Sequence, residues 1–215
     1  MNIDKVFEIL GKEVHKWDVP LIDLIKVTTD DPYKILVGTI LSARTSDVTN
    51  AKACKRLFEK APDFDALEKL SVKEIEELIY PVGFYITKAR HLKVLPKIIR
   101  EEFNGKIPDT IDELVKIPGV GRKTANLVVA VAFNKPAICV DTHVHKIVNR
   151  LGWIKTKNPY QTEMKLRELL PQKYWLTTNR IFVAFGQHLC RPLSPHCSLC
   201  PISEYCKRVG VGKTR

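Results

Sequence analysis

Apolar residues recur along this chain at the three- and four-residue spacing of α-helices. Val6, Ile9 and Leu10 form one such stripe, and another follows Asp-Asp-Pro at residues 30–32, where acidic residues and a proline suit a helix start. Amphipathic helices are predicted at about residues 6–10, 33–40, 46–60, 71–80, 86–103, 110–116, 122–133, 142–151, 159–170 and 174–190. No alternating run is long enough to require a strand, so the pattern predicts an all-α fold.

Two helix–turn–helix segments resemble each other at an offset of 36 residues. Gly83 aligns with Gly119, and Ala89 aligns with Ala125. Each copy reads as a helix, a tight turn that contains glycine, and a second helix. Chance similarity between amphipathic helix pairs explains this repeat about as well as duplication does, so the shared turn is the useful observation.

The second turn has the features of an anion site. It reads Pro-Gly-Val-Gly at residues 118–121 and leads into a helix. Glycines permit positive φ and a close backbone approach, so amides at the helix start can point outward, where the positive end of the helix favours a phosphate. The candidate DNA-binding residues here are Gly119, Val120, Gly121, Arg122 and Thr124. The alternative is that the glycines only permit a sharp turn between two helices.

Lys123 lies in the first turn of a helix that is apolar on nearly every side, and such a helix is buried. A cation at this end is disfavoured by the helix dipole unless an anion compensates for it. The side chain therefore either contacts a phosphate or, as a neutral amine, acts as a nucleophile that forms a Schiff base with a sugar aldehyde. The residues alone favour the phosphate contact.

Asp141 follows a short apolar run and precedes an amphipathic segment, so it is predicted to cap a helix. A cap also fixes a carboxylate at the mouth of a helix. There it can stabilise positive charge that develops on a sugar carbon. His143 and His145 are two residues apart and do not share a helix face, which argues against a metal site at that pair.

The overall charge favours a polyanionic partner. The 215 residues include 35 Lys and Arg against 24 Asp and Glu, a formal net charge of +11. Nucleic acid is the leading candidate, and a generally basic protein is the alternative. The first residues lack the layout of a signal peptide, and no apolar run approaches the roughly 18 residues of a membrane span. We therefore expect an intracellular protein of the cytoplasm or nucleoid.

Four of the six cysteines form a compact cluster with the spacing C-x6-C-x2-C-x5-C. They are Cys190, Cys197, Cys200 and Cys206. Because intracellular thiols stay reduced, a metal site is favoured over disulfides. Zinc sites tend to use two C-x2-C pairs, and the wider loops here favour a [4Fe–4S] cluster, with zinc as the alternative. Cys54 and Cys139 lie in helical or apolar runs and are expected to be ordinary buried thiols.

Taken together, these motifs resemble the endonuclease III family of helix-hairpin-helix DNA glycosylases, in the same order and over nearly the whole chain. The segments that carry the resemblance are LSARTSD at 41–47, VGFYITKA at 82–89, IPGVGRKTAN at 117–126, VDTHVHKIVNRLG at 140–152 and the cysteine loop at 190–206.

The resemblance implies an all-α protein of two domains with a DNA-binding cleft between them. A helical barrel would comprise residues 23–135 and contain the hairpin at about 111–133. Residues 1–22 and 136–215 would form the second domain, with the cluster loop at 190–206. We expect a monomer that binds double-stranded DNA containing a damaged base or an abasic site, with no membrane association.

The resemblance also implies a function and assigns roles to residues. Lys123 would be the catalytic amine, Asp141 its carboxylate partner, and His143 a DNA contact. The four clustered cysteines would hold a [4Fe–4S] cluster. The family removes oxidised or otherwise damaged pyrimidines in base excision repair, and it cleaves the strand 3′ to the abasic site by β-elimination. The nucleotide must first leave the base stack.

Two positions depart from the usual pattern of the family. Arg44 stands where many relatives carry Gln, and Phe84 stands where an aliphatic residue often follows the glycine. Both are expected to contact DNA and to fill the gap left by the displaced nucleotide, so a bulky wedge is retained. The alternative is ordinary surface and hairpin packing. These changes affect the expected lesion range and opposite-base preference rather than the mechanism.

Two other functions remain as alternatives. A mismatch glycosylase would remove an intact thymine or adenine, but such relatives commonly lack a lysine at the position of Lys123. The chain also ends soon after the cysteine loop, where typical adenine glycosylases continue into a further domain. A non-catalytic helix-hairpin-helix module would bind the DNA backbone, and Lys123 and Asp141 would then contribute only to affinity.

Overall fold

The computed structural model describes residues 2–17 and 31–215, and within these ranges it is helical and contains no strand. The all-α prediction is therefore confirmed. None of the described helices is long and apolar enough to cross a membrane.

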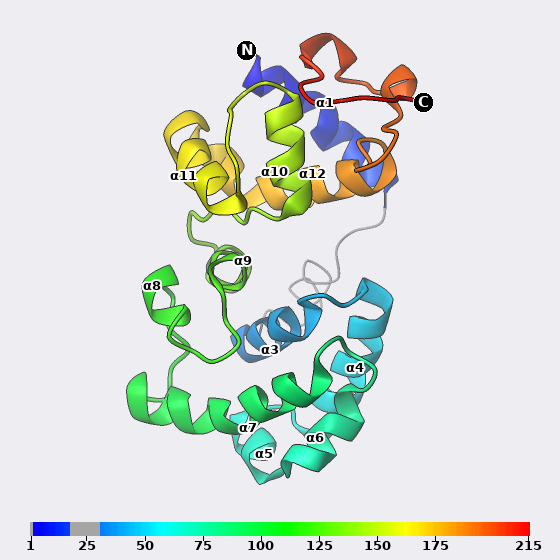
Figure 1. Cartoon of the computed structure of the whole chain (residues 1–215). Helices are drawn as coiled ribbons and strands as arrows, with labels where there is room; N and C mark the ends of the chain where they lie inside the picture. Colours follow the sequence, from blue (N-terminus) through cyan, green and yellow to red (C-terminus); the bar gives the residue numbers. More distant parts are fainter. Residues whose placement is uncertain (1, 18–30) are drawn as a thin grey trace. The chain divides into compact units, whose positions relative to one another are not determined.

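The described residues form two compact units (Figure 1). The hairpin unit contains the described residues from Asp31 to Lys135. The cysteine unit contains the N-terminal helix together with Pro136–Arg215. The predicted domain boundary at residues 22–23 lies outside the described residues.

The hairpin unit is built around two buried helices, α3 and α9, which pack against each other. Asp31 caps α3 by accepting a hydrogen bond from the amide of Tyr33 at 2.9 Å, and Pro32 occupies the first turn, as the sequence predicts. The helices of this unit are α3 (Pro32–Ser42), α4 (Asp47–Lys60), α5 (Phe64–Lys69), α6 (Val72–Ile79), α7 (Tyr85–Glu102), α8 (Ile111–Leu114) and α9 (Arg122–Ala132).

The predicted helices of this unit agree with the observed ones to within a few residues at each end. The exception is α5, a six-residue helix that the sequence pattern did not predict. Asp63 caps it through a 2.8 Å hydrogen bond from the amide of Ala66, but six residues are too few to show a convincing period.

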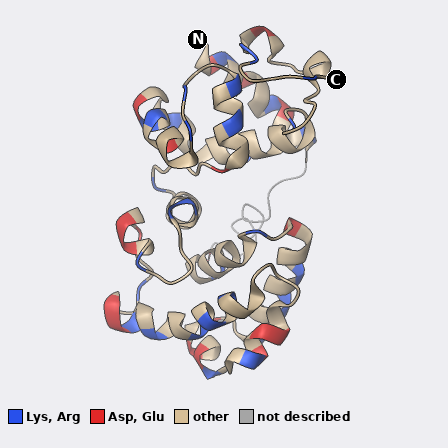
Figure 2. Cartoon of the chain, in the orientation of Figure 1, with Lys and Arg blue, Asp and Glu red and all other residues tan. Residues whose placement is uncertain are grey.

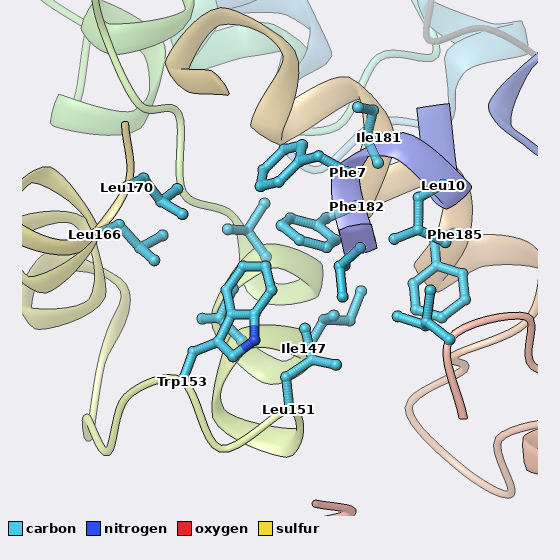
Figure 3. Packing of buried hydrophobic residues seen from close by; sticks show 14 of the residues in the cluster. Phe7, Leu10, Ile147, Leu151, Trp153, Leu166, Leu170, Ile181, Phe182 and Phe185 are labelled. Atoms are coloured by element: carbon cyan, nitrogen blue, oxygen red, sulfur yellow. The ribbon is translucent and has the colours of Figure 1, made fainter. Parts of the chain in front are cut away.

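The cysteine unit has an aromatic core (Figure 3). Phe7 stacks on Tyr174 with ring centroids 4.1 Å apart, and Phe182 meets both Phe7 and Trp153 at their edges. Three of the clustered cysteines, Cys190, Cys200 and Cys206, pack against this core. The elements of the unit are α1 (Ile3–Glu13), η1 (Val14–Lys16), α10 (Thr142–Arg150), α11 (Pro159–Leu169), η2 (Gln172–Tyr174), α12 (Trp175–His188), η3 (Cys197–Leu199) and η4 (Ser203–Tyr205).

Candidate active site and cysteine loop

The chain turns between α8 and α9 through a hydrogen bond from the amide of Val120 to the carbonyl of Ile117, at 3.0 Å. Proline presets φ at the second position of such a turn, and glycine suits a third position with positive φ. Pro118 and Gly119 fill these positions, and Gly119 has φ +83°. A Cβ on Gly119 would lie 2.6 Å from Nδ1 of His91, so the fold requires glycine here.

At Gly121, the N-cap of α9, neither a positive φ nor a close neighbour requires glycine. Its backbone is extended, with φ −86° and ψ 171°, and an added Cβ would meet nothing within 4 Å. The residue is exposed. By contrast, the side chains of Val120 and Thr124 are buried, so any contact of these two with a ligand is limited to the backbone.

Lys123 is exposed in the first turn of α9, and most of the helix beyond it is buried. Asp47, in the first turn of α4, lies close enough to interact with it. Desolvation raises the pKa of the Asp47 carboxyl group, and the positive charge of Lys123 opposes this rise. The hairpin unit therefore places a carboxyl group beside the predicted catalytic amine. Asp47 lies in the LSARTSD segment, but the sequence pattern carries no signal that brings it near Lys123.

Asp141 caps α10 as predicted, and its carboxylate accepts a 2.9 Å hydrogen bond from the amide of Val144. The cap fixes this half-buried carboxylate at the positive end of a helix. Asp141 belongs to the cysteine unit, whereas Lys123 belongs to the hairpin unit.

The two histidines that follow Asp141 have different surroundings. A Cβ on Gly186 would lie 2.4 Å from Nδ1 of His143, so α12 needs glycine there to accommodate the imidazole. His145 instead pairs through Nδ1 with the hydroxyl of Thr162 at 2.7 Å. His145 is therefore hydrogen-bonded to α11, and His143 packs against α12.

Arg44 and Phe84 face each other in the hairpin unit. The guanidinium carbon of Arg44 lies 5.3 Å from the centroid of the Phe84 ring, within the range of a cation–π contact. Both residues are exposed, and both have left-handed backbones, with φ 54° and 59°. For a residue with a side chain this conformation is strained, and such strain is common at functional sites.

The four clustered cysteines line a single pocket in the cysteine unit, together with Arg150. Backbone and side-chain N–H groups point at two of the sulfur atoms. Arg150 donates to Sγ of Cys190 at 3.3 Å, and the amide of Arg208 donates to Sγ of Cys206 at 3.4 Å. Donors aimed at sulfur suit thiolates that serve as ligands.

Arg150 also holds the start of the cysteine loop. It is 7% exposed, and its guanidinium donates to the carbonyls of Cys190, Arg191 and Pro192 at 2.8–3.2 Å. Arg150 is not among the residues predicted from the sequence to have a role at this site. The hydrogen bonds of Arg150 depend on where the cysteine loop folds back onto α10, and a helical sequence pattern does not reveal this.

The pKa values of these thiols bear on whether they could serve as metal ligands. Burial raises the pKa of Cys200 to about 11, and burial also raises the pKa of Cys190 against the opposing effect of Arg150. Such thiols stay protonated unless a metal cation replaces the proton. Within residues 2–17 and 31–215, no group of three or more His, Cys, Asp or Glu side chains is placed to hold a single metal ion. Cys54 and Cys139 are buried, as their sequence surroundings predict.

Lys and Arg residues lie on helices of both units (Figure 2). Several of the basic side chains that the structure describes donate hydrogen bonds to backbone carbonyls at helix ends. Arg56 donates to the carbonyls of Leu78 and Tyr80 at the end of α6. Lys93 donates to those of Glu68 and Leu70 at the end of α5. Part of the basic excess is therefore structural.

The fold, the hairpin and the placement of Lys123 define a helix-hairpin-helix base excision DNA repair protein. Residues 37–172 match the HhH-GPD superfamily of base excision DNA repair proteins. Endonuclease III of Thermotoga maritima is 44% identical over 188 residues, which cover 86% of this chain and 88% of that protein.

Two solved structures extend the comparison. A trapped covalent intermediate of endonuclease III with DNA, in an estranged-adenine complex, is 32% identical with a TM-score of 0.79 over 95% of each chain. A thermostable thymine-DNA glycosylase is 27% identical with a TM-score of 0.78, also over 95% of each chain. The chain belongs to the endonuclease III family. It is a DNA glycosylase and lyase of base excision repair.

Proposed function

We propose that the protein removes oxidised or otherwise damaged pyrimidines from double-stranded DNA and cleaves the strand at the resulting abasic site through an imine on Lys123. The observation that carries this proposal is the exposed amine of Lys123 at the mouth of a buried helix, directly after a glycine turn. A related endonuclease III has been trapped as a covalent intermediate with DNA.

The amine nitrogen of Lys123 attacks C1′ of the displaced nucleotide. The C1′–base bond breaks, its electron pair leaves with the base, and the base takes up a proton. The C1′–O4′ bond then breaks, O4′ takes up the proton that the nitrogen loses, and the nitrogen forms a protonated imine with C1′. This imine acidifies the C2′ proton; its removal breaks the C3′–O bond, and the 3′ phosphate leaves as an anion. Water finally hydrolyses the imine and releases Lys123.

The carboxylate of Asp141 would stabilise positive charge on the sugar as the base leaves. The backbone of the Gly119–Thr124 segment, with Arg122, would bind a phosphate of the same strand. His143, seated against α12, would supply a further DNA contact. We further propose that the protein acts as a monomer.

Arg44 and Phe84 would enter the space that the displaced nucleotide leaves in the stack. Their exposure, their mutual contact and their left-handed backbones support this role. An aromatic ring stacks on any base, so Phe84 suits a wedge that does not depend on sequence.

We propose that Cys190, Cys197, Cys200 and Cys206 hold a [4Fe–4S] cluster. The shared pocket and the N–H groups directed at sulfur support it. When bound, the cluster would fold the 190–206 loop rather than take part in bond breaking. Arg150 would orient this loop through its hydrogen bonds to three successive carbonyls.

Borohydride trapping tests the role of Lys123. Wild-type protein should form a covalent adduct with DNA that contains an abasic site or thymine glycol. Lys123→Ala should form none and lose strand cleavage by on the order of 10³-fold or more. Lys116→Ala, an exposed lysine before the same turn, is the matched control and should trap normally. Turnover by wild type with no trappable adduct would overturn the imine route.

Iron and sulfide analysis of purified protein tests the cluster, with absorbance at the edge of the visible range as a second readout. Four iron and four sulfide per chain are expected. A colourless protein that contains one zinc per chain would overturn the assignment.

A mismatch glycosylase acting on intact thymine is the second candidate, because a thymine-DNA glycosylase shares the fold over most of both chains. That candidate predicts removal of thymine from a T·G pair by direct attack of water, with no adduct. Excision of T·G thymine by Lys123→Ala at the wild-type rate would favour it.

A further inference from the structure

Lys88 of α7 is a buried lysine whose hydrogen-bond acceptors are neutral oxygens. It is 7% exposed, and its Nζ donates to the carbonyls of Leu41 at 2.8 Å and Ala43 at 2.6 Å. A third, longer hydrogen bond of 3.3 Å reaches the hydroxyl of Thr45. The ammonium group therefore ends inside the backbone of residues 41–45 rather than in solvent.

These acceptors belong to the end of α3 and the turn that follows it. The last carbonyls of a helix have no partners within the helix and form the negative end of its dipole, so a cation is stabilised there. Arg44 lies within this turn and has a left-handed backbone. Lys88 thus contacts the chain on both sides of Arg44, through the carbonyl of Ala43 before it and the side-chain hydroxyl of Thr45 after it.

The same turn touches the α6–α7 hairpin backbone to backbone. The amide of Gly83 donates to the hydroxyl of Thr45 at 3.2 Å. A Cβ on Gly83 would lie 2.3 Å from the carbonyl oxygen of Arg44, so only glycine permits this approach. Phe84 follows Gly83, and its ring meets the guanidinium of Arg44.

We infer that Lys88 is a positioning residue that holds Arg44 and Phe84 together as one preformed wedge. The inference rests on the proposed function, in which these two side chains enter the stack. A wedge that is rigid before binding loses little conformational entropy when it enters DNA, and so it holds the nucleotide out more effectively.

The electrostatics agree with this geometry. Burial lowers the pKa of Lys88 to about 8, so most molecules carry the charged form at neutral pH. Backbone dipoles of residues 41–43 stabilise the charge of Lys88. This stabilisation therefore depends on the conformation of the turn that contains Arg44.

Lys93 offers a matched control on the same helix. Its Nζ donates to the carbonyls of Glu68 and Leu70, both at 2.7 Å, at the end of α5. Lys88→Met and Lys93→Met each remove an ammonium group that caps a helix, and both should lower the melting temperature. Only Lys88→Met should alter the wedge.

The test compares two substrates with the full chain. One is duplex DNA that contains thymine glycol, where a nucleotide must leave the stack. The other is a single strand that contains an abasic site, where none must leave. Lys88→Met should lose roughly tenfold to hundredfold in single-turnover excision from the duplex, the effect of losing one or two charged hydrogen bonds. Its cleavage of the single strand should stay within about twofold of wild type, because the substitution leaves the active site intact.

The outcomes separate the possible roles. Equal excision by Lys88→Met and Lys93→Met, or an equal loss by Lys88→Met on both substrates, would overturn the positioning role. Thr45→Val, which removes the hydroxyl between Lys88 and Gly83, should show the same duplex-specific loss to a smaller extent, and it provides the test if Lys88→Met does not fold. A wild-type protein that forms no adduct with either DNA would overturn the proposed function instead.

Discussion

The two helical hairpins of the hairpin unit reverse the chain in different ways. Between α6 and α7, the amide of Tyr85 bonds to the carbonyl of Val82 at 3.1 Å, and Phe84 occupies the left-handed position. Between α8 and α9, Gly119 occupies the equivalent position. The sequence alignment pairs Gly119 with Gly83, one residue away from Phe84, its structural counterpart.

The difference determines what each hairpin presents to a ligand. In the first, α7 begins directly after Phe84, so an aromatic ring projects from the turn. In the second, the extended Gly121 intervenes before α9 and leaves bare backbone exposed. Under the proposed function, the first hairpin would stack on bases and the second would bind a phosphate. Similar helix–turn–helix patterns can thus divide the recognition of DNA between them.

Of the substitutions in the two hairpins, Gly83→Ala should have the largest effect on stability and on excision. The new Cβ would lie 2.3 Å from a backbone carbonyl, so two turns must separate. We expect a loss of about 1–3 kcal/mol in the free energy of unfolding, as for an overpacked core, measured by urea denaturation. Excision from duplex DNA should fall by more than about tenfold because the wedge is displaced.

Gly11→Ala is the matched control for Gly83→Ala, since a Cβ there meets nothing within 4 Å inside α1. It should stabilise the protein slightly. Unchanged stability and excision in Gly83→Ala would show that the two turns are not held in contact.

Replacing Phe84 should separate activity from stability. The ring is 61% exposed, and its left-handed backbone is strained by about 1–2 kcal/mol. In Phe84→Gly, relief of this strain should offset the greater entropy of the unfolded chain, and stability should change by less than about 1 kcal/mol. Excision from duplex DNA should fall roughly tenfold with the loss of base stacking.

Phe84→Leu, which keeps an apolar side chain at the same position, should retain most of the activity lost in Phe84→Gly. If Phe84→Gly instead excises as fast as wild type, the ring has no part in opening the stack.

The helices of both units follow from local sequence, because a buried stripe repeats at helical spacing whatever the fold. The caps at Asp31 and Asp141 were predictable for the same reason, since a cap bonds to amides two or three residues ahead. The offset between the two turns was not predictable. It depends on Phe84 taking a conformation that sequence rules assign to glycine, stabilised by contacts from residues about 40 positions away.

The basic residues show again that tertiary contacts cannot be predicted from the local sequence. A net charge of +11 favoured nucleic acid, and the family supports that. Yet Lys88 and Arg150 are buried and donate hydrogen bonds to backbone carbonyls. In sequence they look like any other basic residue on a helix. Only the tertiary fold separates the cations that hold turns in place from those that can meet a phosphate.

The two glycines of the second hairpin provide the finest test of the comparison. Gly119→Ala should destabilise the protein by about 1–2 kcal/mol, because alanine resists positive φ and crowds His91. Gly121→Ala should change stability by less than about 1 kcal/mol, since its backbone is extended and its surroundings are open. It should nevertheless weaken binding to abasic-site DNA by roughly twofold to tenfold, the effect of one impaired amide–phosphate hydrogen bond. Titration by fluorescence anisotropy at fixed salt measures this change. Full affinity in Gly121→Ala would mean that DNA does not approach the backbone at Gly121 closely enough for a Cβ to interfere.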